Sequence, residues 1–375
     1  MIGIWLCVLA APSVFDSLIR MILLSAAGGR GEERRSHRVG KWLVLIPARG
    51  EGLLVEPTVS SVASSAQGHP VEILVILDGD DDIARRTSES LGATVLVKEP
   101  AGPTKGALLR WVAENHQETI GAADAVLLLD VGSVLGDSFF DRFEWREGAQ
   151  AMQAWLLGSG AGAGEAASAS ELLAQVGEDA GRERLGWNVR LRGTGTALTP
   201  AAFFEIAPRL VTQVEDLEAS LMLASADAGI AMAPRGAVVR DEKPDRIQDA
   251  AVQRSRWLAG KLEVFLRHAP ALYTLIRRRP LEGVAFVAEM LGRPLALTIP
   301  LRVVAGAWVL ADGLPSPEPW RWLLSMAAVA SGLTDVFFLL RGGLSLRGAT
   351  SMGLAWGGAV ALSPRALVRW MRARR

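Results

Sequence analysis

The amino-acid sequence predicts an α/β fold: a Rossmann-related, mostly parallel sheet with helices on both faces, joined to membrane helices at both ends of the chain. One observation is that short apolar runs alternate with helical stretches between residues 42 and 280, which is the pattern of βαβ units. The other is the composition. Half of the 375 residues are hydrophobic, 21% are charged, and the mean hydropathy is +0.25, which is typical of a chain with membrane segments.

The composition also excludes several classes of protein. Lys and Arg total 40 and so do Asp and Glu, whereas a dedicated nucleic-acid binder carries a basic excess. The single cysteine, Cys7, excludes an intramolecular disulfide and a cysteine-rich zinc site. The four histidines are scattered along the chain and are interpreted as incidental: His37, His69, His116 and His268.

Three apolar segments predict the membrane part of the chain. They cover residues 1–27, 283–311 and 320–340, and each is interrupted by only a few charged residues. A buried helix of a soluble domain remains the alternative for the first segment. A basic stretch at residues 30–41 places the following domain in the cytoplasm by the positive-inside rule. We therefore expect a multi-pass protein of a bacterial inner membrane.

This pattern divides the chain into three predicted parts. Residues 1–27 form an N-terminal membrane anchor, residues 42–280 a cytoplasmic α/β domain, and residues 283–375 a set of C-terminal transmembrane or interfacial helices. A stretch rich in Gly, Ala and Ser, residues 158–169, is interpreted as a flexible linker or loop inside the middle part.

The middle part contains four continuous apolar runs that are typical of buried parallel strands. They lie at residues 42–46, 72–77, 94–97 and 125–129. Helical candidates lie between them, at residues 54–65, 83–91 and 106–118. Three of the runs end in polar, turn-forming residues. Because ligands of such sheets bind beyond the carboxyl ends of the strands, we expect the functional site there.

The turns themselves narrow the chemistry. None is a G-x-G-x-x-G segment that opens a helix, and there is no Walker A sequence, which argues against a dinucleotide oxidoreductase and a P-loop ATPase. Instead an acid follows a strand twice, at Asp78 and Asp130. Such a carboxylate can hold a metal that binds a diphosphate, or the hydroxyls of a ribose. A single one is more often a turn or capping residue.

A series of short motifs gives these acids a context. In chain order they are I-P-A-R-G-E at residues 46–51, Asp78, T-K-G-A-L at 104–108, Asp130, G-T-G at 193–195, V-E-D at 214–216, D-E-K-P at 241–244 and Q-R-S-R-W at 253–257. Together they resemble the membrane-bound family 2 glycosyltransferases, which include cellulose and hyaluronan synthases and ceramide glucosyltransferases. The resemblance covers roughly residues 42–270. It implies a GT-A-like fold.

The resemblance also implies an activity. Members transfer a sugar from a nucleoside diphosphate, here with UDP favoured, to a membrane-associated lipid or glycan acceptor, with inversion. The chain would be a metal-dependent hexosyl- or N-acetylhexosaminyl-transferase. The residues implied to bind the nucleotide sugar are Pro47, Glu51, Asp78, Lys105, Asp130 and Arg256, with Asp130 as the ligand of Mg²⁺ or Mn²⁺. Those implied to bind the acceptor are Gly193, Gly195, Gln253 and Trp257, and the catalytic pair is Asp216, as general base, with Glu215.

The metal motif departs from the family pattern. Gly132 stands where the second acid of D-x-D is usual. Mg²⁺ keeps several waters, so one carboxylate together with the diphosphate oxygens can hold it. Asp137 is a second candidate ligand, and a catalytically inactive relative is the other alternative. Gly50 also replaces a usual Asn.

The catalytic acids have a physical basis of their own. Glu215 and Asp216 open a predicted helix, and a carboxylate at a helix N-terminus is stabilised as the anion, which suits a proton acceptor. The alternative interpretation is that Glu215, Asp216 and Glu218 merely complement the helix dipole.

The last motif places three side chains on one helix face. Gln253, Arg256 and Trp257 are spaced i, i+3, i+4, so that Arg256 could bind a diphosphate and Trp257 could stack on a sugar. The alternative is an amphipathic surface helix with Arg254 and Lys261 in solvent and Trp257 in the core.

The acceptor and the number of sugars stay open at this point. About 95 residues follow the catalytic part, enough for two or three spans of ~20 residues, which favours transfer of one or a few sugars over processive polymer synthesis. A partner subunit or a second copy of the chain could extend the membrane part. An inactive nucleotide-sugar-binding regulator of a partner synthase, supported by Gly132, is the second hypothesis. A membrane protein that binds another nucleotide is the third, and it would not need the Glu215–Asp216 pair.

Overall fold

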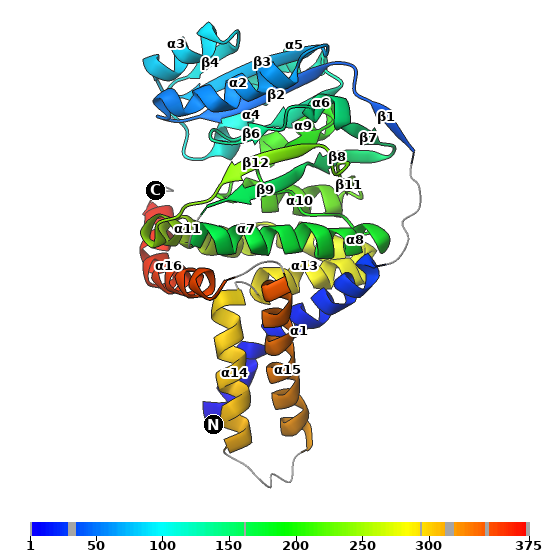
Figure 1. The fold of residues 1–375 in the computed structure, drawn as a ribbon, viewed down its shortest axis with the longest axis vertical. Helices are drawn as coiled ribbons and strands as arrows, with labels where there is room; N and C mark the ends of the chain where they lie inside the picture. Colours follow the sequence, from blue (N-terminus) through cyan, green and yellow to red (C-terminus); the bar gives the residue numbers. More distant parts are fainter. Residues whose placement is uncertain are drawn as a thin grey trace.

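The computed structural model describes residues 2–28, 35–160, 163–292, 295–311, 319–341 and 345–372. Its centre is a seven-stranded sheet with the strand order β11-β8-β10-β5-β2-β3-β4 (Figure 1). The strands are β2 (Trp42–Ala48), β3 (Val71–Asp78), β4 (Thr94–Lys98), β5 (Ala125–Leu128), β8 (Ala149–Gln153), β10 (Thr196–Leu198) and β11 (Gly229–Met232). The four predicted strands correspond to β2, β3, β4 and β5.

The sheet is mostly parallel, as predicted. β2 pairs in parallel with β3 and β5, and β3 with β4, so that Leu45 lies between Leu74 and Leu128 in the register. β10 is antiparallel to both of its neighbours, β5 and β8, and β11 returns parallel to β8. The carboxyl ends of the parallel strands therefore meet at one edge, where the turns after β3 and β5 lie.

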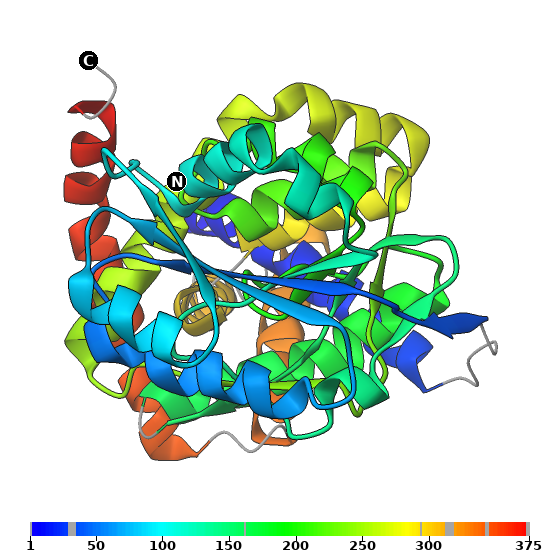
Figure 2. The same ribbon diagram turned by 90° about the horizontal axis from the view of Figure 1, so that it is seen from above.

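Two hydrophobic cores cover the two faces of this sheet. Val44 and Ile46 of β2 face one core, and Leu43 and Leu45 face the other. The first core is closed by α2 (Val55–Ser65), α3 (Asp82–Ser90) and α6 (Phe139–Arg142), and the second by α4 (Lys105–Asn115), α5 (Gln117–Gly121), α9 (Pro200–Ile206) and α10 (Glu215–Ser225). Figure 2 shows helices on both sides of the central strands. Burial on both faces is why these strands read as continuous apolar runs.

Smaller elements complete the α/β part. β6 (Val134–Leu135), β12 (Val238–Glu242) and β9 (Trp155–Ser159) form a three-stranded sheet, and β1 (Ser36–Arg38) pairs with β7 (Glu144–Arg146). Two 3-10 turns occupy Gly52–Leu54 and Ala207–Arg209.

A layer of helices lies beneath the sheets in Figure 1. It contains α7 (Ala163–Leu173), a π-helix (Ala174–Asp179), α8 (Ala180–Arg184), α11 (Ile247–Arg267), α12 (Ala269–Arg278), α13 (Pro280–Gly292) and α16 (Leu346–Arg372). The linker predicted at residues 158–169 is wrong for its described part, because β9 ends at Ser159 and α7 begins at Ala163. Gly158 is small for a packing reason: a Cβ there would lie 2.3 Å from Ser168 Oγ.

Three further helices extend from this layer. α14 (Leu295–Ala311) and α15 (Pro319–Arg341) run side by side away from the sheet, and α1 (Ile2–Ala27) contacts both of them (Figure 1). In the part of the chain that the structure describes, no helix is both long enough and apolar enough to cross a membrane. The predicted membrane helices at the two ends and the predicted multi-pass location in an inner membrane are therefore wrong, and the orientation argument from residues 30–41 falls with them.

The charged residues inside the apolar segments explain this outcome. Arg20 of α1 contacts Asp335 of α15 at 2.7 Å and Asp16 at 3.1 Å. Arg302 of α14 contacts the other oxygen of Asp335 at 2.6 Å, and Arg20 also reaches Glu178 of the π-helix at 3.0 Å. The side chains of Arg20, Arg302, Asp16 and Asp335 are at most 2% exposed. These charges join helices to one another, and α14 has only 17 residues.

Candidate active site

The structure brings an ammonium group and two carboxylates together at the carboxyl edge of the sheet. Lys105 Nζ contacts the Asp130 carboxylate, lies 3.0 Å from Glu215 Oε1 and donates to Gly193 O at 3.2 Å. The lysine begins α4, Asp130 follows β5, and Glu215 begins α10. Thr104 caps α4 by accepting a hydrogen bond from a backbone N–H, which fixes where the lysine side chain starts. Three predicted site residues thus meet at one point.

Gly193 supplies the backbone at this meeting point. Its φ is +79°, a conformation that favours glycine. A Cβ there would lie 3.7 Å from Glu215 Oε1, 3.8 Å from Asp130 Oδ2 and 3.9 Å from Asp216 Cβ. The predicted residue therefore lies among all three acids. Gly195 also has a positive φ, but a Cβ there would meet core side chains such as Val239, at 3.0 Å.

Asp216 differs from the other acids in having few partners. Its Oδ1 accepts a hydrogen bond from Leu217 N at 2.8 Å, and no lysine or arginine of the described residues forms an ion pair with it. Burial, and next the charge of Glu215, raise the pKa of Asp216 to about 7, against the opposing influences of the Leu217 N–H and Lys105. A carboxyl with a pKa near neutrality is well matched to general acid–base chemistry.

Lys105 stays cationic in this environment. Burial alone would lower the pKa of its ammonium group, but the charges of Asp130 and Glu215 outweigh burial and raise it. The cluster therefore contains one permanent positive charge beside three carboxyl groups.

A buried acid that the sequence did not single out for this role supports the start of α10. The Glu218 carboxylate is fully buried and accepts hydrogen bonds from Val211 N, Thr212 N and Thr212 Oγ1 at 2.9–3.0 Å. Its other oxygen lies 2.5 Å from His268 Nε2 at the end of α11. The loop before Glu215 is thereby tied to its own helix and to α11.

Helix α11 also approaches this loop directly. A Cβ on Gly260 would lie 2.8 Å from both methyl carbons of Val214, so only glycine allows the approach. The interpretation of His268 as incidental is wrong, because it holds the Glu218 carboxylate. A lone histidine and a lone glycine carry no pattern in a single sequence, so nothing short of the three-dimensional contacts identifies them.

The predicted nucleoside residues lie beyond β2 and β3. Asp78 ends β3 and is buried; its Oδ1 accepts from Gly102 N at 2.6 Å, and Arg49 Nη1 lies 3.6 Å from Oδ2. Burial raises the pKa of Glu51, and the charges of Asp81 and Asp130 raise it further. Glu51 therefore faces the same acidic region as the lysine cluster. Pro47 lies in β2 and is partly buried.

The predicted acceptor helix shows a mixed result. Arg256 and Trp257 are exposed, Trp257 by 41%, and Gln253 is partly buried. Within the described residues, none of them has a hydrogen bond or ion pair with the lysine cluster. The alternative arrangement does not hold either, because Arg254 is only 3% exposed and its guanidinium lies over the Trp356 ring at 5.5 Å.

The metal prediction can be tested on the donor set around Asp130. Among the described residues, no group of three or more His, Cys, Asp or Glu could hold a metal. Asp130 itself is 44% exposed, and its ion pair with Lys105 uses only Oδ1. Because Mg²⁺ is usually held by one or two carboxylates together with substrate phosphates, a half-exposed Asp130 fits a metal that binds with a diphosphate.

The missing second acid has a structural reason. Gly132 has a φ of +90°, and its N–H donates to Thr58 Oγ1 of α2 at 2.9 Å. A side chain at this position would strain the backbone, so the turn after β5 favours glycine over an acid here. Asp137, the other candidate ligand, is exposed.

Comparisons with known proteins place this geometry in a fold. No protein-family model matches the chain, and no curated protein matches it. The solved structure of the mannosyltransferase PcManGT from Pyrobaculum calidifontis, in complex with GDP-Man and Mn²⁺, is similar with a TM-score of 0.62. The two are 14% identical over 96% of this chain and 99% of that one. Glucosyl-3-phosphoglycerate synthase from Mycobacterium tuberculosis, in complex with Mn²⁺, UDP and phosphoglyceric acid, is 18% identical with a TM-score of 0.40, over 64% of this chain and 81% of that one.

The first similarity shows the fold. Over 96% of its length the chain follows the fold of this mannosyltransferase. The α/β part of the fold prediction is thereby confirmed. Mn²⁺, one of the two predicted metals, is present in the complex of the mannosyltransferase.

Proposed function

We propose that the protein is an inverting glycosyltransferase that moves a hexose or N-acetylhexosamine from a nucleoside-diphosphate sugar to a hydroxyl of a lipid or glycan acceptor. The observation that carries the proposal is the cluster of Lys105, Asp130, Glu215 and Asp216 around Gly193, at the carboxyl edge of a GT-A-type sheet. Residues 42–280 are the proposed catalytic part.

The proposed reaction is a single in-line displacement. The acceptor oxygen attacks the anomeric carbon from the face opposite the diphosphate, while Asp216 takes the proton of the attacking hydroxyl. A new C–O bond forms, the bond from the anomeric carbon to the diphosphate oxygen breaks, and the configuration inverts. Lys105 holds positive charge beside Asp130 and Glu215, and it would attract the diphosphate.

A metal fits the same place. Asp130 would hold Mg²⁺ or Mn²⁺, which when bound neutralises charge on the leaving diphosphate. On the nucleoside side, Glu51, Asp78 and Pro47 are proposed to bind base and ribose, and Arg256 to reach the diphosphate from α11. Gly193, Gly195, Gln253 and Trp257 are proposed to face the acceptor.

The test is nucleotide release from a panel of UDP- and GDP-sugars, with lipid extract or oligosaccharide as acceptor, in Mg²⁺, in Mn²⁺ and in EDTA. We expect release that is donor-selective and lost in EDTA, and a product with the opposite anomeric configuration by NMR. Asp216→Asn should reduce kcat by about 10²–10⁴-fold, the range for loss of a general base. Asp227→Asn, at an exposed position beyond the other end of α10, is the matched control and should retain activity.

Two outcomes would contradict the proposal. Retained anomeric configuration would exclude a single displacement with Asp216 as base. Nucleotide binding without release from any donor would favour the other candidate, an inactive nucleotide-sugar-binding regulator, for which the glycine turn at Gly132 is the supporting observation.

A further inference from the structure

We infer that Gln153 is a positioning residue of the transfer site, because its buried amide sets the glycine turn that holds Asp130 and Lys105. The inference rests on the proposed function for its catalytic consequence, but its structural part can be tested separately. Gln153 is the last residue of β8 and carries none of the sequence motifs.

The amide of Gln153 holds both sides of the turn at residues 192–196. Its Oε1 accepts hydrogen bonds from Arg192 N at 2.8 Å and from Thr196 Oγ1 at 3.1 Å. Its Nε2 donates to Thr194 O at 2.9 Å and to Ala154 O at 3.1 Å. The side chain is completely buried. Two donors and two acceptors must be satisfied at once, and among side chains of this size only a carboxamide supplies both.

The turn at residues 192–196 contacts both Asp130 and Lys105. Thr194 Oγ1 accepts a hydrogen bond from the backbone N–H of Asp130 at 3.1 Å and donates one to Ser133 Oγ at 2.9 Å. This hydroxyl therefore joins the turn to the loop after β5. The carbonyl of Gly193, one residue earlier, accepts from Lys105 Nζ at 3.2 Å. A displacement of the turn therefore moves the candidate metal ligand and the cation together.

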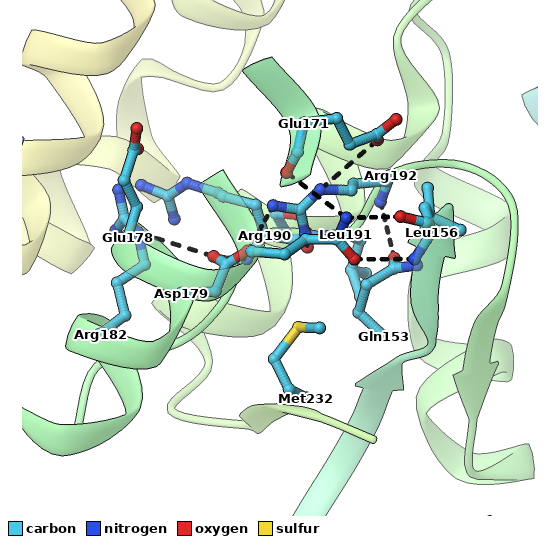
Figure 3. Close-up of polar contacts among 12 residues, drawn as sticks. Gln153, Leu156, Glu171, Glu178, Asp179, Arg182, Arg190, Leu191, Arg192 and Met232 are labelled. Atoms are coloured by element: carbon cyan, nitrogen blue, oxygen red, sulfur yellow. Dashed lines mark hydrogen bonds and ion pairs between the residues drawn. The ribbon is translucent and has the colours of Figure 1, made fainter. Parts of the chain in front are cut away.

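A second anchor holds the same turn from the helix layer. The Arg192 guanidinium contacts the Asp179 carboxylate, lies 3.7 Å from Glu171 and donates to Arg190 O at 2.9 Å (Figure 3). Figure 3 shows Gln153 on the other side of this residue, toward the strands. The ionic network thus fixes the Arg192 side chain, whereas the glutamine fixes its backbone and the residues that follow.

The test compares three variants. Gln153→Met removes the donors and the acceptor, and Gln153→Glu keeps the shape and the acceptor but puts an oxygen opposite Thr194 O. Gln150→Met is the matched control on the same strand, where the glutamine Oε1 accepts a hydrogen bond from Thr199 Oγ1 at 2.9 Å, away from the site. Both Gln153 variants should lower kcat by about 100-fold, the cost of a misplacement of about 1 Å. The donor KM should change less than kcat, because Glu51 and Asp78, the proposed nucleoside-binding residues, lie outside the displaced turn.

Hydrogen exchange measured by mass spectrometry supplies a readout that needs no activity. Exchange should rise in peptides covering residues 128–133 and 190–196 of the Gln153 variants, and it should not change in residues 42–48 or in the Gln150→Met protein. An unchanged kcat in both Gln153 variants, an unchanged exchange at 128–133, or a rise in exchange that includes 42–48 would overturn the inference. A wild type without activity on any donor would instead overturn the proposed function, and the exchange result would still decide the role of the glutamine.

Discussion

Two of the clusters of charged side chains in the molecule are built in opposite ways. The helix cluster lies between α1, α14 and α15 and consists of Arg20, Arg302, Asp16 and Asp335. The site cluster lies at the edge of the sheet and consists of Lys105, Asp130, Glu215 and Asp216. In the helix cluster each carboxylate contacts an arginine and every side chain is at most 2% exposed. In the site cluster there is one lysine for three acids, and among the described residues no lysine or arginine forms an ion pair with Asp216.

The difference separates structural charges from chemical ones. Buried charges that are fully paired recover much of their desolvation cost, and their role is to specify which helices meet. A buried acid without a cationic partner recovers little of its desolvation cost, and its pKa moves toward neutrality. This is the case for Asp216, whose pKa is raised by burial and by the charge of Glu215. The unpaired charge is therefore the one to associate with proton transfer.

The largest expected effect is in the helix cluster. Arg302→Met leaves Asp335 with only one of its two arginines in a buried place, and breaking a buried pair costs about 3–5 kcal/mol. We expect urea denaturation to show a loss of that size, with kcat unchanged in the protein that remains folded. Adding Asp335→Asn should recover part of the loss, and Arg347→Met, at an exposed position of α16, serves as the control. A stability equal to that of the wild type would show that the two clusters do not differ in this way.

In the site cluster the removal of a charge should stabilise the folded protein instead of destabilising it. The pKa of Asp216 is raised from 3.8 to about 7, so the native state binds this proton more tightly than the unfolded state. Stability from this group is therefore present below about pH 4 and is lost as the pH rises toward 7. Asp216→Asn should stabilise the protein at pH 8 by about 1–3 kcal/mol, and should have little effect at pH 4.

Thermal unfolding at the two pH values measures this difference, and Asp137→Asn should be neutral at both. If Asp216→Asn destabilised the protein at pH 8, Asp216 would have a cationic partner in solution, and the contrast between the clusters would fail.

The smallest expected effect sharpens the comparison inside the site. Because the charge of Glu215 raises the pKa of Asp216 and that of Lys105 lowers it, Glu215→Gln should move the rise of kcat with pH to lower pH. Lys105→Gln should move it to higher pH, each by about one unit or less. Initial rates between pH 5.5 and 9 at saturating donor measure the midpoints. Shifts of the same sign for both variants would show that another group is titrating.

Much of the fold could be predicted because its signals are local. β2, β3, β4 and β5 are apolar runs in consecutive residues, and their ends agree with the predicted ends within two residues. Lys105, Asp130 and Glu215 were each predicted as site residues from motifs whose order along the chain resembles that of a known family, but their meeting at one point is visible only in the structure. The roles of all the predicted site residues, those of Asp216 and Lys105 included, stay predictions.

The failures have a common physical cause. Asp335 and Arg302 were interpreted as interruptions of membrane spans. A sequence does not show that a charged residue has a distant partner, and Arg20 and Asp335, which form an ion pair, are 315 residues apart. Gln153 and His268 were missed for a related reason: one polar residue at the end of a strand or helix has no periodicity, and its meaning lies wholly in distant contacts. Residues 158–169 were predicted to be a flexible linker because they are rich in small residues, but small residues also occur where helices and strands pack closely.

The pair between Arg20 and Asp335 also sets an order in time. The two residues are 315 positions apart, so at about 5–20 residues per second a ribosome makes the acid roughly 15–60 s after the arginine. When the ribosome reaches Asp335, the strands of the sheet have already been made, Arg20 has Asp16 and Glu178 as partners, and Arg302, made 33 residues earlier, still lacks its carboxylate. Asp335 is therefore the last of the three carboxylates that Arg20 receives, and the contact between α1 and α15 can form only once α15 has been made.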